Sequence, residues 1–196
     1  TGSGYNPTKP YDNRDPRFAL TVVKNGDTGW PSYNSKPIEI FEGGANAAPI
    51  SGATPSGYYL KKYCDASVNL QPTSINTKRH SWITFRLGEF YLNYAEAVFH
   101  VLGSPDAKNT TYAMSATEAV NKIRQRSDVG MPVFPVGLNN ANFDKRYRNE
   151  RMVELAFEGH RRMDLVRWGI YYETIQKTNA ALANWWDSAD NYRYLL

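Results

Sequence analysis

Three glutamates in the last third of the sequence have a spacing that could support acid–base chemistry. Glu150, Glu154 and Glu158 are four residues apart, so on a helix they share one face, with neighbouring Cβ atoms about 5–6 Å apart. Two carboxylates at such a separation could serve as the nucleophile and the general acid of a retaining glycosidase. Catalysis by these carboxylates is therefore one hypothesis for this segment.

The same segment also has the spacing of ion pairs within helices. Arginines follow Glu158 by three and four residues, and Arg167 follows Asp164 by three. Paired carboxylates with shifted pKa values occur in structural ion-pair networks as well as in active sites. We expect an ion-pair network that holds the turn around Gly159 and does not act on a substrate, formed by Glu154, Glu158, Arg161, Arg162 and Asp164.

The three histidines, His80, His100 and His160, form no recognisable metal or catalytic motif. None is part of an HExxH pattern, although Glu96 precedes His100 by four residues and Asp164 follows His160 by four. Such pairs are commoner as polar helix faces than as metal ligands. The sequence also has no GxSxG nucleophile motif and no GK[ST] phosphate loop. We expect no catalytic residue, no bound metal and no cofactor.

The composition narrows the class of protein. There are 23 basic and 19 acidic residues, a formal net charge of +4, and the pI is about 9.1. Basic residues mostly alternate with acidic ones, as in KRYRNERMVE, which is typical of a salt-bridged helix surface and not of a nucleic-acid-binding track. No apolar run approaches the roughly 20 residues of a membrane span. The single cysteine, Cys64, excludes an intramolecular disulfide.

The first part of the chain carries aromatic side chains that a helical core does not explain. Residues 1–57 hold 15 of the 25 glycines and prolines, which predicts long loops with a short strand at 19–23 or 38–41. A ring in such a loop can stack on the apolar face of a pyranose, or it can pin the loop onto the helices. Both interpretations are open for Trp30, Tyr33, Tyr58 and Tyr59.

The rest of the chain has helical periodicity. A 3.6-residue apolar stripe over 86–102 predicts a helix that Gly103 ends, and Ser115 with Glu118 forms a capping box that opens a second, antiparallel helix. We expect the following side chains to be buried between paired helices: Leu87, Phe90, Tyr94, Val120, Ile123, Leu155 and Phe157.

A third helix should begin near Asn142 or Phe143, with Gly159 as a kink or as its end. Residues 161–184 should then complete a second hairpin. The sequence thus predicts a mainly α fold with a loop-rich segment over 1–79 and a helical-hairpin region over 80–196.

Several blocks of the sequence occur in the order seen in one protein family. RLGEFYLNYAEA, NKIRQRSD and NERMVELAFEGHRRMDLVRWG follow one another, and YDNRDPRF and GYYLKKYCD lie upstream. Over residues 11–169 the sequence resembles the SusD/RagB family. The resemblance implies tetratricopeptide-like paired helices. It also implies a cell-surface lipoprotein of the Bacteroidetes outer membrane that binds glycans for nutrient uptake and caps a SusC-like, TonB-dependent transporter.

Two features differ from the family pattern. Family members are typically longer and begin with a lipidated cysteine, whereas this sequence begins TGSG. Cys64 follows LKKY, which does not resemble a lipoprotein processing site. We therefore expect the chain to be the C-terminal portion of a longer protein that reaches the membrane only through a lipid anchor outside these residues.

The resemblance implies glycan binding without hydrolysis, which makes the ring-bearing loops within residues 11–60 the candidate ligand-binding site. Trp30 is the first candidate for a stacking platform, because the turn residues of GDTGWPSYN surround it. The further candidates are Tyr33, which could extend the platform, Asn34 and Arg14 as hydroxyl contacts, and Tyr58 and Tyr59. Two alternatives stay open, namely a helical module that docks a transporter or captures peptides, and a glycosidase.

Overall fold

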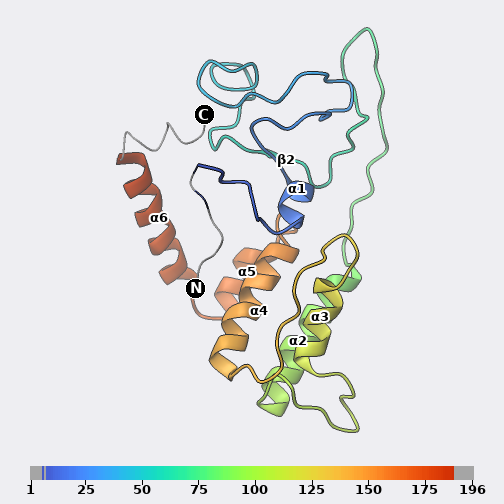
Figure 1. Ribbon diagram of the computed structural model, residues 1–196, viewed down its shortest axis with the longest axis vertical. Coiled ribbons are helices and arrows are strands. Elements are labelled where there is room, and N and C mark those ends of the chain that lie inside the picture. Colours follow the sequence, from blue (N-terminus) through green and yellow to red (C-terminus); the bar gives the residue numbers. More distant parts are fainter. Residues whose placement is uncertain (1–5, 7, 188–196) are drawn as a thin grey trace. The chain divides into compact units, whose positions relative to one another are not determined.

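The computed structural model describes residue 6 and residues 8–187, and the fold is mainly α (Figure 1). The chain forms two compact units. The helical unit comprises Asp15–Arg17 and Trp82–Arg167. The loop unit takes its described residues from Thr1–Arg14, Phe18–Ser81 and Trp168–Leu196. The predicted segments 1–79 and 80–196 extend beyond the described residues at both ends of the chain, and that division of the sequence stays a prediction.

The helices of the helical unit are α2 (Leu87–Leu102), α3 (Ala116–Arg124), α4 (Asn140–Glu154) and α5 (His160–Arg167). Helices α2 and α3 pack side by side, as Figure 1 shows. The first turn of α2 and the last turn of α3 line the same pocket, so the two helices run antiparallel. This confirms the predicted pairing.

The helix ends follow the local sequence. Gly103 ends α2 in the left-handed conformation, with a φ of 70°, which costs a residue without Cβ little. Ser115 Oγ accepts a hydrogen bond from the Glu118 backbone N–H (3.2 Å), and Glu118 Oε2 accepts one from the Ser115 N–H (2.7 Å). The predicted capping box is therefore confirmed.

Helix α4 begins slightly before the predicted start, because Asn139 caps it by accepting a hydrogen bond from the Asn142 N–H (2.9 Å). It ends at Glu154. Gly159 therefore neither kinks nor ends the helix. With a φ of +82°, it lies in the turn that precedes α5.

The core of the helical unit brings α2, α3 and α4 together. The Phe143 ring lies 4.9 Å from that of Phe99 and 6.2 Å from that of Phe134, measured between centroids. Tyr147 donates a hydrogen bond from its hydroxyl to the Leu92 carbonyl (2.9 Å). Three predicted core residues are indeed buried, namely Val120, Ile123 and Leu155.

Three other predicted core residues are exposed. Leu87 and Phe90 are 67% and 59% exposed, because α2 turns a neighbouring face inward. That face consists of Gly88, Glu89, Leu92, Ala95, Val98 and Phe99. The predicted face and the observed face of α2 both have helical periodicity. The observed face packs inward because it carries small residues such as Gly88 and Ala95, which allow a neighbouring helix to approach closely. Phe157 is 62% exposed because it lies in the turn after α4, with a φ of 63°, and not on a helix.

The loop unit contains little regular structure. Its elements are α1 (Arg17–Thr21), whose first residue belongs to the helical unit, β1 (Val22–Val23), β2 (Tyr59–Leu60) and α6 (Tyr171–Asp187). The strands pair antiparallel, with Val22 opposite Leu60 and Val23 opposite Tyr59. A strand therefore lies within the predicted 19–23 segment. The 38–41 segment forms none, although Ile38 exchanges backbone hydrogen bonds with the 26–27 turn.

Candidate functional site

The loop that carries the predicted stacking platform is fixed to the segment after β2. The Asn34 backbone N–H donates to the Pro31 carbonyl (2.8 Å), which closes a turn. Ser32 donates to the Ala66 carbonyl through its backbone N–H (2.8 Å) and through its hydroxyl (2.9 Å). These bonds hold the turn of residues 31–34 against Ala66 inside the loop unit.

Trp30 and Tyr33 are both reachable from solvent. Tyr33 is 47% exposed, and Trp30 is partly exposed. The Lys61 ammonium lies over the Trp30 ring, 5.4 Å from its centroid, and donates to the Ala19 carbonyl (2.9 Å). Among the described residues no ring contact joins Trp30 to Tyr33, so the structure presents two rings on one loop and not one stacked pair.

The two polar residues predicted to contact a ligand, Asn34 and Arg14, each form a hydrogen bond with a residue nearby in the sequence. Asn34 Oδ1 accepts a hydrogen bond from the Lys36 backbone N–H (3.1 Å), which is an Asx turn, and Asn34 is partly exposed. The Arg14 Nε donates to the Pro10 carbonyl (2.7 Å), and Arg14 is exposed. Both residues stay predictions as ligand contacts.

Tyr58 and Tyr59 have structural partners. The Tyr58 ring lies edge-on to Tyr11 and to Phe18, 6.4 Å from each centroid. Burial and the hydrogen bond with Tyr58 raise the pKa of Tyr11. Tyr59 donates from its hydroxyl to the Asn46 carbonyl (2.7 Å). These contacts favour a role in pinning loops for both tyrosines. As ligand contacts, Trp30 and Tyr33 stay predictions.

The three regularly spaced glutamates lie inside the helical unit, where arginines occupy their oxygens. Glu154 accepts hydrogen bonds from Arg17 (2.8 Å), Arg86 (2.6 Å) and Arg126 (2.5 Å). Glu158 accepts two from Arg86, each 2.7 Å long. Glu150 is bound by Arg17 and Arg124.

The electrostatics of Glu154 do not suit a general acid. Burial acts to raise the pKa of this carboxyl, but the hydrogen bonds from the three arginines outweigh it and lower the pKa to about 2. A general acid of a glycosidase needs a raised pKa, so that it carries a proton at neutral pH. Glu154 is therefore a charged partner of the arginines within the fold and has no proton to donate at neutral pH.

The predicted ion-pair network exists, but with different partners. The expected Asp164–Arg167 pair is present at 3.0 Å. Asp164 also accepts a hydrogen bond from Arg151 (2.7 Å), and Arg167 binds Glu96 through two nitrogens, at 2.5 and 2.6 Å. The partners of Glu154 lie 28 to 137 residues away in the sequence, so the network joins separate segments and does more than hold the turn around Gly159.

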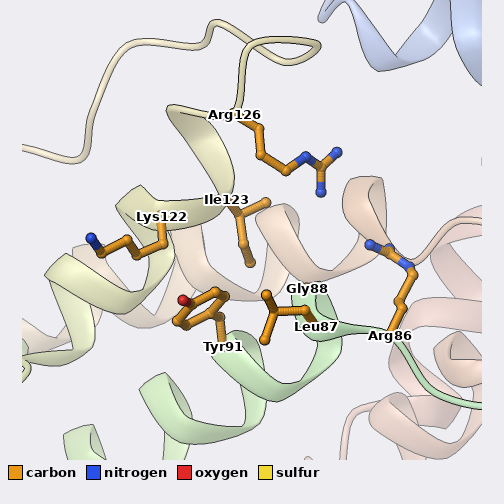
Figure 2. A pocket seen from close by; sticks show the side chains of 7 residues that line it. All are labelled: Arg86, Leu87, Gly88, Tyr91, Lys122, Ile123 and Arg126. Carbon is orange, nitrogen blue, oxygen red and sulfur yellow. The ribbon is translucent and has the colours of Figure 1, made fainter.

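A pocket that sequence reasoning missed lies between the first turn of α2 and the last turn of α3. Its volume is about 430 Å³, within the range of small-ligand sites. Figure 2 shows Lys122 at one end and two arginines at the other, with apolar side chains between them. The lining consists of Arg86, Leu87, Gly88, Tyr91, Lys122, Ile123 and Arg126. The sequence does not predict this pocket, because its apolar pattern assigns Leu87 to the core.

The model of the SusD family matches residues 1–193. The chain belongs to the SusD family. A curated relative, the SusD-like protein P25 of Formosa agariphila, is 31% identical over 119 residues, which are 60% of this chain and 20% of that protein. The matched residues thus span about a fifth of the curated relative's length.

Solved structures of SusD-like proteins share the fold. A SusD-like protein of Bacteroides fragilis is 28% identical with a TM-score of 0.66, covering 82% of this chain and 29% of that one. A SusD-like carbohydrate binding protein of the same species is 27% identical with a TM-score of 0.57, covering 86% and 31%. A SusD homolog of Bacteroides thetaiotaomicron is 28% identical with a TM-score of 0.60, covering 92% and 35%.

Two further features of this SusD-family chain concern metals and membranes. In the part of the chain that the structure describes, no three His, Cys, Asp or Glu side chains come together as a metal site. Of the histidines, His160 lies 3.6 Å from the Glu89 carboxylate. No helix within the described ranges is long and apolar enough to span a membrane.

Proposed function

We propose that this SusD-family chain is part of a non-catalytic, cell-surface protein that binds oligosaccharides or polysaccharides. One solved relative is itself described as a carbohydrate binding protein. The observation that carries the proposal is the loop of residues 30–34. Backbone hydrogen bonds fix this loop, and it presents Trp30 and the exposed Tyr33.

The physical reason lies in the amphipathic nature of a pyranose. Its C–H face is apolar and stacks on an aromatic ring, while its hydroxyl rim needs hydrogen-bond partners. Trp30 and Tyr33 supply rings, and Asn34 and Arg14 supply donors in the same unit. Because few hydrogen bonds to a solvated sugar yield much net free energy, we expect a Kd on the order of micromolar to millimolar.

The paired carboxylates support binding without hydrolysis. Glu150, Glu154 and Glu158 are bound by arginines, and the pKa of Glu154 is about 2, which is unsuited to proton donation. Reducing sugar released from a panel of polysaccharides would contradict this part of the proposal.

We further propose a place for the protein at the outer membrane, where it passes glycan to a SusC-like, TonB-dependent transporter. Membership of the SusD family supports this role. The expected result is that the full-length protein, purified from bacterial outer membranes under mild conditions, brings a TonB-dependent transporter with it. Recovery of the protein alone at every detergent concentration would count against the partnership.

A second candidate function is protein interaction through the pocket between α2 and α3. Phe85 is 66% exposed, and its ring lies 6.2 Å from that of Phe90, which is 59% exposed. With Leu87 they form an apolar surface beside the pocket, and exposed apolar surface of this kind is typical of interaction sites. If peptides bind there, Leu87→Glu should weaken the capture of a peptide pool and leave glycan binding unchanged.

The test of the main proposal is calorimetric titration with a panel of oligosaccharides. Trp30→Ala should weaken binding at least several-fold, since stacking contributes most of the affinity. Trp82→Ala is the matched control, because Trp82 is 77% exposed and belongs to the helical unit. An unchanged isotherm for Trp30→Ala would place the glycan site elsewhere.

A further inference from the structure

The Lys61 ammonium has a fixed position beside the candidate platform. Its Nζ lies over the Trp30 ring, 5.4 Å from the centroid, and donates to the Ala19 carbonyl at 2.9 Å. The backbone N–H of the same residue donates to the Thr21 carbonyl, also at 2.9 Å. Both ends of the lysine are thus anchored at the edge of the β1–β2 pair, so its charge is held in place before any ligand arrives.

Among the described residues, no carboxylate forms an ion pair with this ammonium. Within residues 6 and 8–187, neither Lys61 nor Lys36 forms an ion pair, whereas Lys24 in the same unit pairs with Asp27 at 2.5 Å. Asp65, which adjoins the segment that holds the platform loop, accepts hydrogen bonds from Ser67 through Oδ1. The Lys61 ammonium over the Trp30 ring therefore keeps donors for a ligand besides the one that bonds to Ala19.

We propose that the Trp30 platform selects glycans that bear an anionic substituent, either a uronate carboxylate or a sulfate ester, and that Lys61 is the residue that determines this preference. The proposal rests on the glycan-binding function proposed above and names its substrate class. Lys61 lies over one face of the partly exposed indole, so a sugar that meets the rest of the ring can direct its charged group round the ring edge toward the ammonium.

The expected size of the preference follows from Coulomb's law. An ammonium and an anion a few ångströms apart at a wetted surface attract each other modestly, which corresponds to a preference of about threefold to tenfold. Because Lys61 is already held by Ala19, little side-chain entropy is lost on contact. The interaction is exposed to water, so salt should weaken it.

The experiment is a set of calorimetric titrations of the full-length protein with three oligosaccharides of equal length, one neutral, one of uronic acids and one sulfated. We expect tighter binding of at least one anionic oligosaccharide than of the neutral one at low salt, and a smaller difference at high salt. The arm that binds more tightly identifies the carboxylate or the sulfate ester as the recognised group.

Three variants test the role of Lys61. Lys61→Gln should reduce the affinity for the anionic oligosaccharide to that for the neutral one, and Lys61→Arg should retain the preference. Lys145→Gln, which removes an exposed charge from α4 in the helical unit, should keep the preference unchanged. Melting temperatures within a degree or two of one another would show that the variants share one fold.

The outcomes separate the two proposals. Equal affinity of the unaltered protein for all three oligosaccharides, or an anionic preference that survives in Lys61→Gln, would overturn the selectivity while the Trp30 site stands. Unchanged binding by Trp30→Ala, or no binding of any oligosaccharide, would overturn the glycan-binding function itself and the selectivity with it.

Discussion

In the helical unit, buried carboxylates meet arginines from distant parts of the sequence, whereas the loop around Trp30 is fixed by hydrogen bonds to backbone carbonyls. Glu150 and Glu154 are 2% and 3% exposed and lie among apolar helices. Ser32 and Asn34, by contrast, bond through their backbone at the surface of the loop unit. The ion pairs of the helical unit depend on the identity of the side chains. The structure of the loop around Trp30 depends mainly on the conformation of its backbone.

Substitutions in the two regions should differ in their cost to stability. Removing one partner of a buried ion pair leaves an uncompensated charge, which costs about 3–5 kcal/mol. Replacing a partly exposed ring on a loop leaves the backbone hydrogen bonds in place, and surface substitutions of this kind usually change stability by less than about 0.5 kcal/mol. Side chains on this loop, the proposed ligand contacts among them, can therefore vary at little cost to the stability of the fold.

The largest expected effect comes from Glu154→Gln. The variant leaves Arg17, Arg86 and Arg126 without their shared carboxylate, so the free energy of unfolding should fall by about 3–5 kcal/mol. Denaturant unfolding followed by circular dichroism measures the change. Glu173→Gln is the control, because its pair with Lys177 is exposed on α6. Loss of glycan binding with an unmoved thermal transition would show that Glu154 serves a ligand instead.

Leu155→Ala should cost about 2–5 kcal/mol, because removing a large buried side chain leaves a cavity. Leu155 is 3% exposed at the end of α4. Phe157→Ala, two residues on and 62% exposed, is the matched control and should have little effect. Equal melting temperatures for the two variants would contradict the packing of α4 described above.

Acid should weaken the helical unit through Glu154. Its pKa is lowered from the ordinary 4.5 to about 2 in the folded protein, so the unfolded state binds the proton more readily. The stabilisation is therefore present in full above pH 4.5 and is lost as the pH falls toward 2, by on the order of 3 kcal/mol. Unfolding curves between pH 7 and pH 2 measure this loss, and Glu154→Gln should show a correspondingly smaller dependence on pH.

A smaller effect is expected at the start of α3. Ser115→Ala removes the side-chain oxygen that accepts from the Glu118 N–H and should cost about 1 kcal/mol. Thr110→Ala, in the exposed loop before the helix, is the control. A change in melting temperature no larger than the control's would mean that the capping box contributes little to the unit.

Local signals in the sequence predicted the parts of the fold that depend on local interactions. Ser115 and Glu118 lie three residues apart and form their capping box within one turn, and Gly103 ends α2 through its own backbone freedom. The family blocks predicted the fold class, because they record the order of many such elements.

The sequence did not predict features that depend on distant partners. Helix α2 has two apolar faces of equal period, and only its packing against α3 and α4 turns Leu92 inward and Leu87 outward. The partners of Glu154 come from three separate segments, so spacing within one helix suggested the nearer Arg161 and Arg162. The pocket likewise depends on distant partners, since its lining comes from two helices.

Binding and stability measured together on two variants test most directly whether the two units have separate roles. Trp30→Ala and Glu154→Gln are each titrated calorimetrically with the tightest-binding oligosaccharide and melted under the same conditions. We expect Trp30→Ala to lose at least several-fold in affinity with an unchanged melting temperature, and Glu154→Gln to melt earlier while the fraction still folded binds normally. Unchanged affinity in Trp30→Ala, together with lost affinity in folded Glu154→Gln, would contradict the account and move the ligand site to the helical unit.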